Sequence, residues 1–252
     1  MERIAIFAAL QWECRAVLHP LRQVRRIGLG GFTCWQAHTP EREVWVVKTG
    51  VGVQRAAAAV DAIGDAQTFQ LFVSSGCAGG LAPDLEPGDL VLATAISGDG
   101  TEHVIATGAA ARARAGAAAA AAGLRWVEGP LLCSDNALLT AAAKRAAAAE
   151  GAVVVEMEGG AIAARAAAAQ VPLLSVRAIL DGAEHELQIP ATVVNAATGG
   201  VRPLALAGYV ATHPRVLAEL MALQRMQRAA RSSLERFFGQ WLAGSPVNAR
   251  GG

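Results

Sequence analysis

The chain has 252 residues and a formal net charge of +1 at pH 7, and aromatic residues make up 5% of it. A charge this small argues against a general nucleic-acid surface, and so few aromatic residues argue against a base-stacking platform. The four cysteines form neither a CxxC pair nor a Cys/His cluster, which favours reduced thiols over disulfides or a zinc site. We therefore expect a cytoplasmic protein without a metal ion and without a nucleic-acid partner.

Strand-like and helix-like segments alternate along the chain. The apolar, β-branched segments predict strands over residues 3–10, 31–39, 43–50, 69–76, 88–96, 129–136, 153–158 and 172–182. Alanine-rich segments predict helices over residues 12–21, 53–64, 109–123, 137–151, 160–170 and 215–242. Ser134, Asp135 or Asn136 is the expected N-cap of the fourth helix. The alternation predicts a single α/β domain over residues 1–252, with a mixed, largely parallel sheet flanked by helices.

Four of these strands end in residues that are unusual for a core. They are Glu13, the glycine-rich stretch 74–81, the acidic stretch 156–158, and the pair Arg177 and Asp181. The carboxyl ends of parallel strands meet at one edge of a sheet, where α/β proteins form their sites. We therefore expect these four segments to lie together.

Each of these features also has a purely structural explanation. A glutamate at a helix start is favoured by the helix dipole, and a glycine-rich stretch after a strand is commonly a tight turn. Arg177 and Asp181 are spaced as a local ion pair. Cys77 is better explained as a small buried residue than as a nucleophile, because no histidine is evidently paired with it.

The order of the motifs is more specific than any one of them. The chain resembles the purine nucleoside phosphorylase and nucleosidase family over roughly residues 3–182. The resemblance rests on IAIFAALQWEC (4–14), KTGVGVQRAAAAV (48–60), SGCAGGLAPDLEPGDLVLAT (75–94), CSDN (133–136), VEMEG (155–159) and VPLLSVRAILD (171–181). It implies the three-layer α/β fold of that family and an enzyme that cleaves an N-glycosidic bond.

The resemblance also implies roles for the acids. Cleavage of a ribosyl C–N bond passes through an oxocarbenium-like state, and adenine leaves readily only after its N7 is protonated. Asp181 matches the family's general acid, Glu13 the residue that activates water, and Arg177 an arginine near the nucleophile. Glu158 matches the acid that binds the ribose 2′- and 3′-hydroxyls. Glu156 is a second, weaker candidate for that contact.

The remaining implied contacts belong to the ribose and the purine. Met157 would pack on the ribose face, and the stretch of Gly76, Cys77, Ala78 and Gly79 would offer backbone N–H groups. Leu138 and Leu139 would line the purine pocket. Leu138 stands where the family usually has an aromatic residue, and Leu180 and Cys77 stand where the related nucleosidases carry serines. We therefore expect a more aliphatic purine pocket than in those enzymes.

The C-terminal region, with a helical extension over about 203–242, resembles another branch. Residues 190–238 are similar to the tail of hopanoid-associated phosphorylases, which are thought to remove adenine from adenosylhopane. In the last helix Arg225, Arg228 and Arg231 form a basic stripe beside a separate Leu/Met stripe. The apolar stripe either packs on the domain or a second subunit, or gives the helix a peripheral contact with a membrane.

Three functions follow from these observations. The first is cleavage of a 5′-substituted adenosine-type nucleoside, adenosylhopane-like, by phosphate or water. The second is hydrolysis by a methylthioadenosine/S-adenosylhomocysteine nucleosidase, and the third is a non-catalytic nucleoside-binding protein. We expect no cofactor, with phosphate open as a co-substrate, and a homo-oligomer that is cytoplasmic, with membrane association left open.

Overall fold

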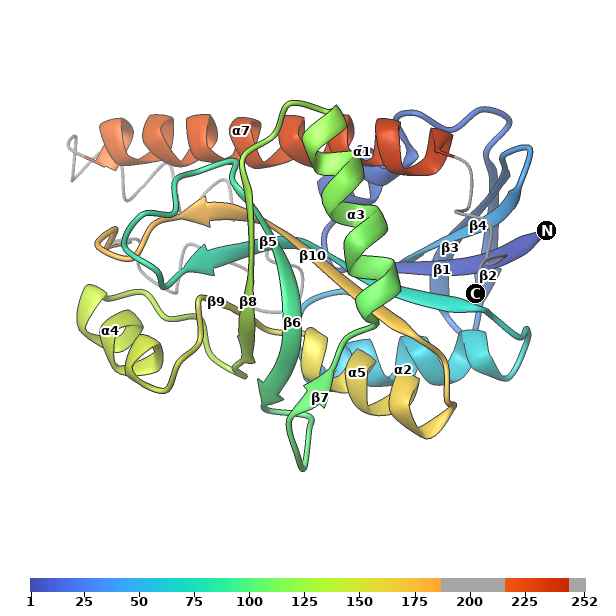
Figure 1. Cartoon of the computed structure of the whole chain (residues 1–252), viewed down its shortest axis with the longest axis horizontal. Helices are drawn as coiled ribbons and strands as arrows, with labels where there is room; N and C mark the ends of the chain where they lie inside the picture. The colour runs from blue at the N-terminus through green and yellow to red at the C-terminus, as the bar shows by residue number, and fades with distance from the viewer. Residues whose placement is uncertain (187–215, 245–252) are drawn as a thin grey trace, which may run out of the picture.

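A mixed sheet with helices on both faces forms the centre of the protein (Figure 1). The computed structural model describes residues 1–186 and 216–244. The strands are β1 (Glu2–Ala8), β2 (Arg25–Leu29), β3 (Phe32–His38), β4 (Arg42–Lys48), β5 (Leu71–Gly80), β6 (Leu90–Gly98), β7 (Ile105–Ala106), β8 (Trp126–Cys133), β9 (Val154–Glu156) and β10 (Leu173–Asp181). The helices are α1 (Gln11–Leu18), α2 (Val53–Gly64), α3 (Ala109–Ala121), α4 (Ala141–Ala149), α5 (Gly159–Ala168) and α7 (Val216–Ala243).

Part of the sheet closes into a ring. The strand order is β10-β6-β8-β9-β5-β1-β4-β3-β2, and β10 also pairs with β5. Strands β5, β10, β6, β8 and β9 therefore return on themselves, while β1, β4, β3 and β2 extend the sheet from β5. Parallel pairing joins β1 to β4 and β5, and β5 to β10, whereas β10 and β6 run antiparallel. The predicted single α/β domain with a mixed sheet is confirmed, and the ring closure is an addition to it.

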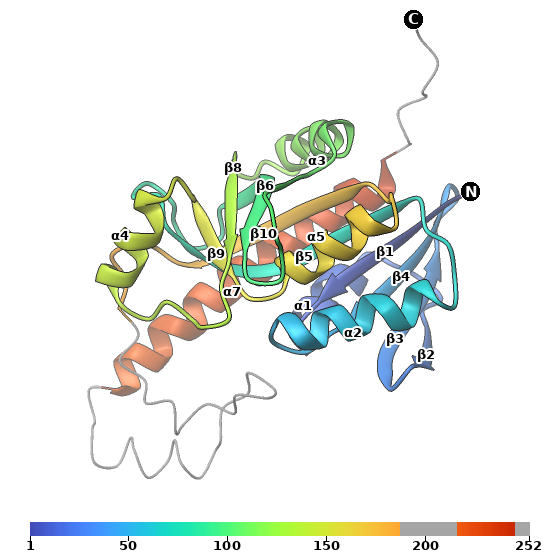
Figure 2. The same cartoon turned by 90° about the horizontal axis from the view of Figure 1, so that it is seen from below.

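The core lies in two layers, one on each face of the sheet. On one face α2 and α5 lie side by side (Figures 1 and 2) and bury Ala56, Ala59, Ala161 and Ile162 against the sheet. On the other face α1, α3 and α7 pack on the outward side chains of the same strands. Strands covered on both faces need apolar residues at successive positions, and residues 4–8 of β1 are accordingly all buried.

Two local predictions were wrong. The glycine-rich stretch after residue 73 is not a turn, because β5 continues through it to Gly80 and pairs with β10 as far as Gly79. Helix α4 starts at Ala141 rather than at residue 137, and its N-cap is Thr140, whose Oγ1 accepts the Ala143 N–H at 3.2 Å. The expected caps at 134–136 instead form a local turn in which Ser134 Oγ donates to the Asn136 carbonyl oxygen. Strands β2 and β7 were not predicted.

The C-terminal half of α7 is a core element. Its buried side chains include Leu234, Phe237, Phe238 and Trp241. The two phenylalanine rings pack edge to face, with their centroids 5.0 Å apart. Arg42 Nη1 donates to the Trp241 carbonyl oxygen at 2.7 Å and ties the helix to β4. This half of the helix therefore packs on the domain, whereas the surroundings of the Leu/Met stripe, which lies in the other half, stay a prediction. Residues 203–215 of the predicted extension lie outside the described residues.

Nothing in the described part of the chain is both long and apolar enough to serve as a membrane-crossing helix. Arg225, Arg228 and Arg231 are exposed on α7, and Arg231 pairs with Glu235. Contact of α7 with a membrane surface stays a prediction.

Candidate active site

A pocket of about 200 Å³ opens at the carboxyl ends of β5, β9 and β10, beside the N-terminus of α1. This is the edge at which the four unusual strand ends were expected to meet. The residues that line it are Ala9, Leu10, Glu13, Val51, Cys77, Ala78, Gly79, Asn136, Ala137, Leu138, Leu139, Val155, Glu156, Met157, Glu158, Leu180 and Asp181. Of the predicted site residues, only Gly76 and Arg177 lie behind this lining.

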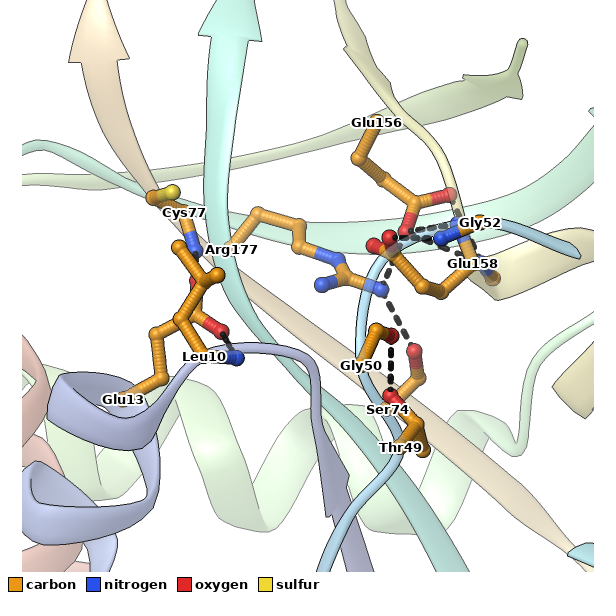
Figure 3. Close-up of polar contacts among 11 residues, drawn as sticks. Leu10, Glu13, Thr49, Gly50, Gly52, Ser74, Cys77, Glu156, Glu158 and Arg177 are labelled. Carbon is orange, nitrogen blue, oxygen red and sulfur yellow. Dashed lines mark hydrogen bonds and ion pairs between the residues drawn. The ribbon is translucent and has the colours of Figure 1, made fainter. Parts of the chain in front are cut away.

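Glu13 is buried in the first turn of α1, where two backbone groups fix its carboxylate (Figure 3). Oε2 accepts the Leu10 N–H at 2.8 Å, and Oε1 accepts the Cys77 N–H of β5 at 2.8 Å. Burial raises the pKa of Glu13 above its usual value, and the two N–H groups partly oppose this. A carboxylate that is held in place with a raised pKa is suited to accept a proton from water.

Arg177 and Glu156 form a buried ion pair behind the pocket (Figure 3). Arg177 Nη2 lies 2.6 Å from Glu156 Oε2 and also donates to Ser74 Oγ. The Glu156 carboxylate further accepts the Gly159 N–H at 2.8 Å and the Glu158 N–H at 3.0 Å, so it caps α5. The local pairing of Arg177 with Asp181 does not occur. The oxygens of Glu156 already have these partners in the fold. Contact between Glu156 and a substrate stays a prediction.

Glu158 is the N-cap residue of α5, and its side chain turns toward the loop before α2. Oε1 accepts the Gly52 N–H at 2.8 Å, and the residue is 8% exposed. Burial, followed by the neighbouring Glu156 carboxylate, raises the pKa of Glu158 to about 8. Hydroxyl donors from a sugar would stabilise the ionised form.

Asp181 ends β10 at the pocket wall, across from Gly79 of β5. Its Oδ2 forms an ion pair with Nζ of Lys144 from α4, a residue that the sequence analysis missed. The signal was present: Lys144 lies three residues after Ala141 and three before Ala147, so it shares the buried face of an alanine-rich helix. A lysine on such a face needs an acidic partner, and none is near it in sequence.

Gly76 and Gly79 let other groups approach β5 closely. An ideal Cβ on Gly76 would lie 2.8 Å from Glu13 Oε1 and 3.0 Å from Arg177 Nη1. Cys77, between them, is half-buried, and its burial beside the Glu13 carboxylate raises the pKa of its thiol well above the usual value. A thiol in that state is a poor nucleophile, which agrees with the structural explanation of Cys77.

The rest of the pocket is apolar. Met157, Leu138 and Leu139 line it, and Leu139 is 40% exposed. Their contacts with ribose and purine stay predictions. Leu10 and Val51 add to this wall and were not predicted. Residues 137–140 are free to line the pocket because α4 begins only at Ala141.

Across residues 1–186 and 216–244, no group of three or more His, Cys, Asp or Glu side chains could hold a metal ion. The expectation of an enzyme without a cofactor stays a prediction.

The family assignment agrees with this site. The family model described as the phosphorylase superfamily matches residues 3–206, so the chain belongs to that superfamily. The resemblance found in the sequence is thereby confirmed, as is the expected kind of enzyme, a nucleoside phosphorylase or nucleosidase. A search of curated proteins by sequence found no match.

Solved structures show the same fold at low sequence identity. A Helicobacter pylori MTAN mutant with 5′-methylthioadenosine in the active site has a TM-score of 0.75 and 20% identity, covering 96% of this chain and 98% of that one. The futalosine hydrolase of Helicobacter pylori has the same TM-score and identity, with 96% and 97% covered. An S-adenosylhomocysteine nucleosidase of Streptococcus pyogenes, with 5-methylthiotubericidin, has a TM-score of 0.75 and 20% identity, covering 98% of each chain.

Proposed function

We propose that the protein is a nucleosidase that hydrolyses the N-glycosidic bond of a 5′-substituted adenosine-type nucleoside and releases adenine. The observation that carries the proposal is the set of acidic groups in the pocket. Four carboxyl groups line it, those of Glu13, Glu156, Glu158 and Asp181, whereas no lysine or arginine is among the lining residues of the described chain.

This acidic lining favours water over phosphate as the nucleophile. Arg177 is the cation near Glu13, and its Nη2 is already held by Glu156 and Ser74. A phosphate dianion beside Glu13 would lie among four carboxyl groups at low dielectric, and the guanidinium of Arg177 behind them is already paired with Glu156, which makes its binding costly. A neutral water molecule has no such cost and can donate to Glu13.

The proposed reaction uses three of the acids. Asp181 donates a proton to the leaving base, and the C–N bond breaks with its electron pair going to the base. The ribosyl group then carries positive charge, which the Glu158 carboxylate stabilises while it accepts the ribose hydroxyls. Glu13 takes a proton from the water that attacks the anomeric carbon.

The apolar wall supports a substrate with a non-polar 5′-substituent. Beside the residues expected to contact the purine and the ribose, Leu10 and Val51 offer it no charged partner. Structural neighbours whose names include 5′-methylthioadenosine or S-adenosylhomocysteine agree with an adenosine-type substrate. Adenosylhopane is the lipid-linked candidate from the tail resemblance, and it remains a proposal because much of that tail lies outside the described residues.

The test is base release from 5′-methylthioadenosine, adenosine, inosine and an adenosylated lipid, with and without phosphate. We expect release from at least one adenine nucleoside without phosphate. Asp181→Asn and Glu13→Gln should each lower kcat by roughly 10²-fold or more, the usual size of an acid–base contribution. Glu150→Gln, an exposed change at the end of α4, is the matched control and should leave kcat unchanged.

The outcomes separate the three functions. Release that requires phosphate would move the protein to the phosphorylase branch and contradict the role of Glu13. Binding of every nucleoside without release would indicate a non-catalytic binding protein. Release from the adenosylated lipid alone would support the lipid-linked substrate.

A further inference from the structure

Lys144 is the most deeply buried ammonium group in the described part of the chain. The residue is 1% exposed, and it projects from α4 to the end of β10. Its Nζ contacts Asp181 Oδ2 and donates to the carbonyl oxygens of Gly182 at 2.8 Å and His185 at 3.0 Å. A buried ammonium is tolerated only when its three donors are satisfied, and here each has one acceptor.

The contact with Lys144 involves one of the two Asp181 carboxyl oxygens. Oδ2 is held by Lys144, whereas Oδ1 accepts no hydrogen bond from any residue that the structure describes. The carboxyl group also lines the pocket. One oxygen is therefore anchored while the other is left for a ligand.

We propose that Lys144 is the positioning residue of the leaving-group acid. Asp181 takes up a proton from solvent on Oδ1 while Oδ2 keeps its contact with the Lys144 ammonium. That proton moves to the ring nitrogen of the base, the C–N bond breaks with its electron pair going to the base, and Asp181 is left as a carboxylate. The Lys144 ammonium holds the carboxyl group in place before the transfer and stabilises the negative charge that forms. The inference rests on the proposed function, because it assigns the same proton transfer to Asp181.

The surroundings of Lys144 provide a matched control. Helix α4 and residues 182–186 are also joined at the surface, where Arg145 Nη1 lies 2.9 Å from Glu184 Oε2. Both of those side chains are mostly exposed, so their ion pair adds little stability. Arg145→Met removes a cation one residue away and the surface ion pair between the same two segments. It leaves the contact of Lys144 with Asp181 in place.

The experiment compares two substrates that differ in their need for a proton. 5′-Methylthioadenosine requires protonation of its base, whereas its N7-methylated analogue already carries a positive charge on the ring. We expect Lys144→Met to lower kcat on the first by roughly 10²-fold, with KM and the rate on the methylated analogue changed by less than about threefold. Asp181→Asn should show the same selectivity, and Arg145→Met should match the wild type.

Other outcomes overturn the inference. Equal losses on both substrates would make Lys144 merely structural, as would a Lys144→Met enzyme within about threefold of wild type on 5′-methylthioadenosine. If Lys144→Met does not fold, Lys144→Arg tests the inference instead. Because this variant retains a cation, it should keep more than about a tenth of the wild-type kcat on 5′-methylthioadenosine. A wild type that releases base from none of the nucleosides, the adenosylated lipid included, or an unimpaired Asp181→Asn, would instead refute the proposed function and this inference with it.

Discussion

Glu158 shows how a single side chain can be costly for the fold and useful for the site. It is buried beside the Glu156 carboxylate, and its pKa is raised to about 8. The Gly52 N–H and the nearby Arg177 guanidinium stabilise its charge. A bound ribose would add hydroxyl donors, so the ionised form gains most from substrate.

This residue makes stability depend on pH. The folded chain keeps the proton of Glu158 up to about pH 8, whereas the unfolded chain loses it near 4.5. The folded state binds more protons in this window, so stability falls as pH rises from about 4.5 to 8. Glu158→Gln removes the titration, and its melting temperature should exceed that of the wild type by more at pH 9 than at pH 5.

The same variant should be much less active. Glu158→Gln loses the negative charge beside the sugar, and we expect kcat/KM to fall by roughly 10²-fold or more. In the wild type kcat/KM should rise between pH 6 and 8 as Glu158 ionises. An equal difference in melting temperature between Glu158→Gln and the wild type at pH 5 and at pH 9 would contradict the raised pKa.

At the scale of elements, the site is assembled by the close approach of α5 to the turn between β6 and β7. An ideal Cβ on Gly160 would lie 1.9 Å from the Asp99 carbonyl oxygen, so only glycine fits at the start of α5. The same helix start carries Glu158. Packing at Gly160 therefore sets where Glu158 lies.

Gly160→Ala should destabilise the protein by about 1–3 kcal/mol, because the turn must move to admit a methyl group. The displacement should also lower kcat/KM. Gly64→Ala is the control, since a Cβ at this last residue of α2 would have no heavy atom within 4 Å. That change should be neutral or stabilise by up to about 1 kcal/mol in urea unfolding. Equal effects of the two changes would refute the steric explanation.

The elements were predicted well where the signal was local. Apolar runs placed the central strands, and the rule that sites form at strand ends brought Glu13, Glu158 and Asp181 to one pocket. The partners of Arg177 and Lys144 were missed, because Glu156 and Asp181 lie 21 and 37 residues away along the chain and no periodicity encodes such pairs. The glycine-rich strand was missed because glycine predicts a turn locally, and only pairing with β10 extends it.

At the scale of the whole molecule, α7 completes the core rather than standing outside it. Phe237 is fully buried with Phe238 and Trp241, against α1, α3 and β10. The basic stripe of the same helix faces outward. Homo-oligomer formation and contact with a membrane surface stay predictions for the exposed face.

Truncation inside this layer should be costly. Phe237→Ala should lower the free energy of unfolding by about 3–5 kcal/mol, because it leaves a cavity in the core. Gln240→Ala, at an exposed position on the same helix, should change it by less than about 0.5 kcal/mol. A small effect of Phe237→Ala would show that α7 does not pack as described.

The central claim is that water, not phosphate, attacks the ribosyl group in a pocket lined by carboxylates. The most direct test is the identity of the sugar product when the purified protein cleaves its substrate in the presence of excess phosphate. We predict the free 5′-substituted ribose, with no sugar 1-phosphate. A sugar 1-phosphate as the main product would contradict hydrolysis and would make phosphate the nucleophile.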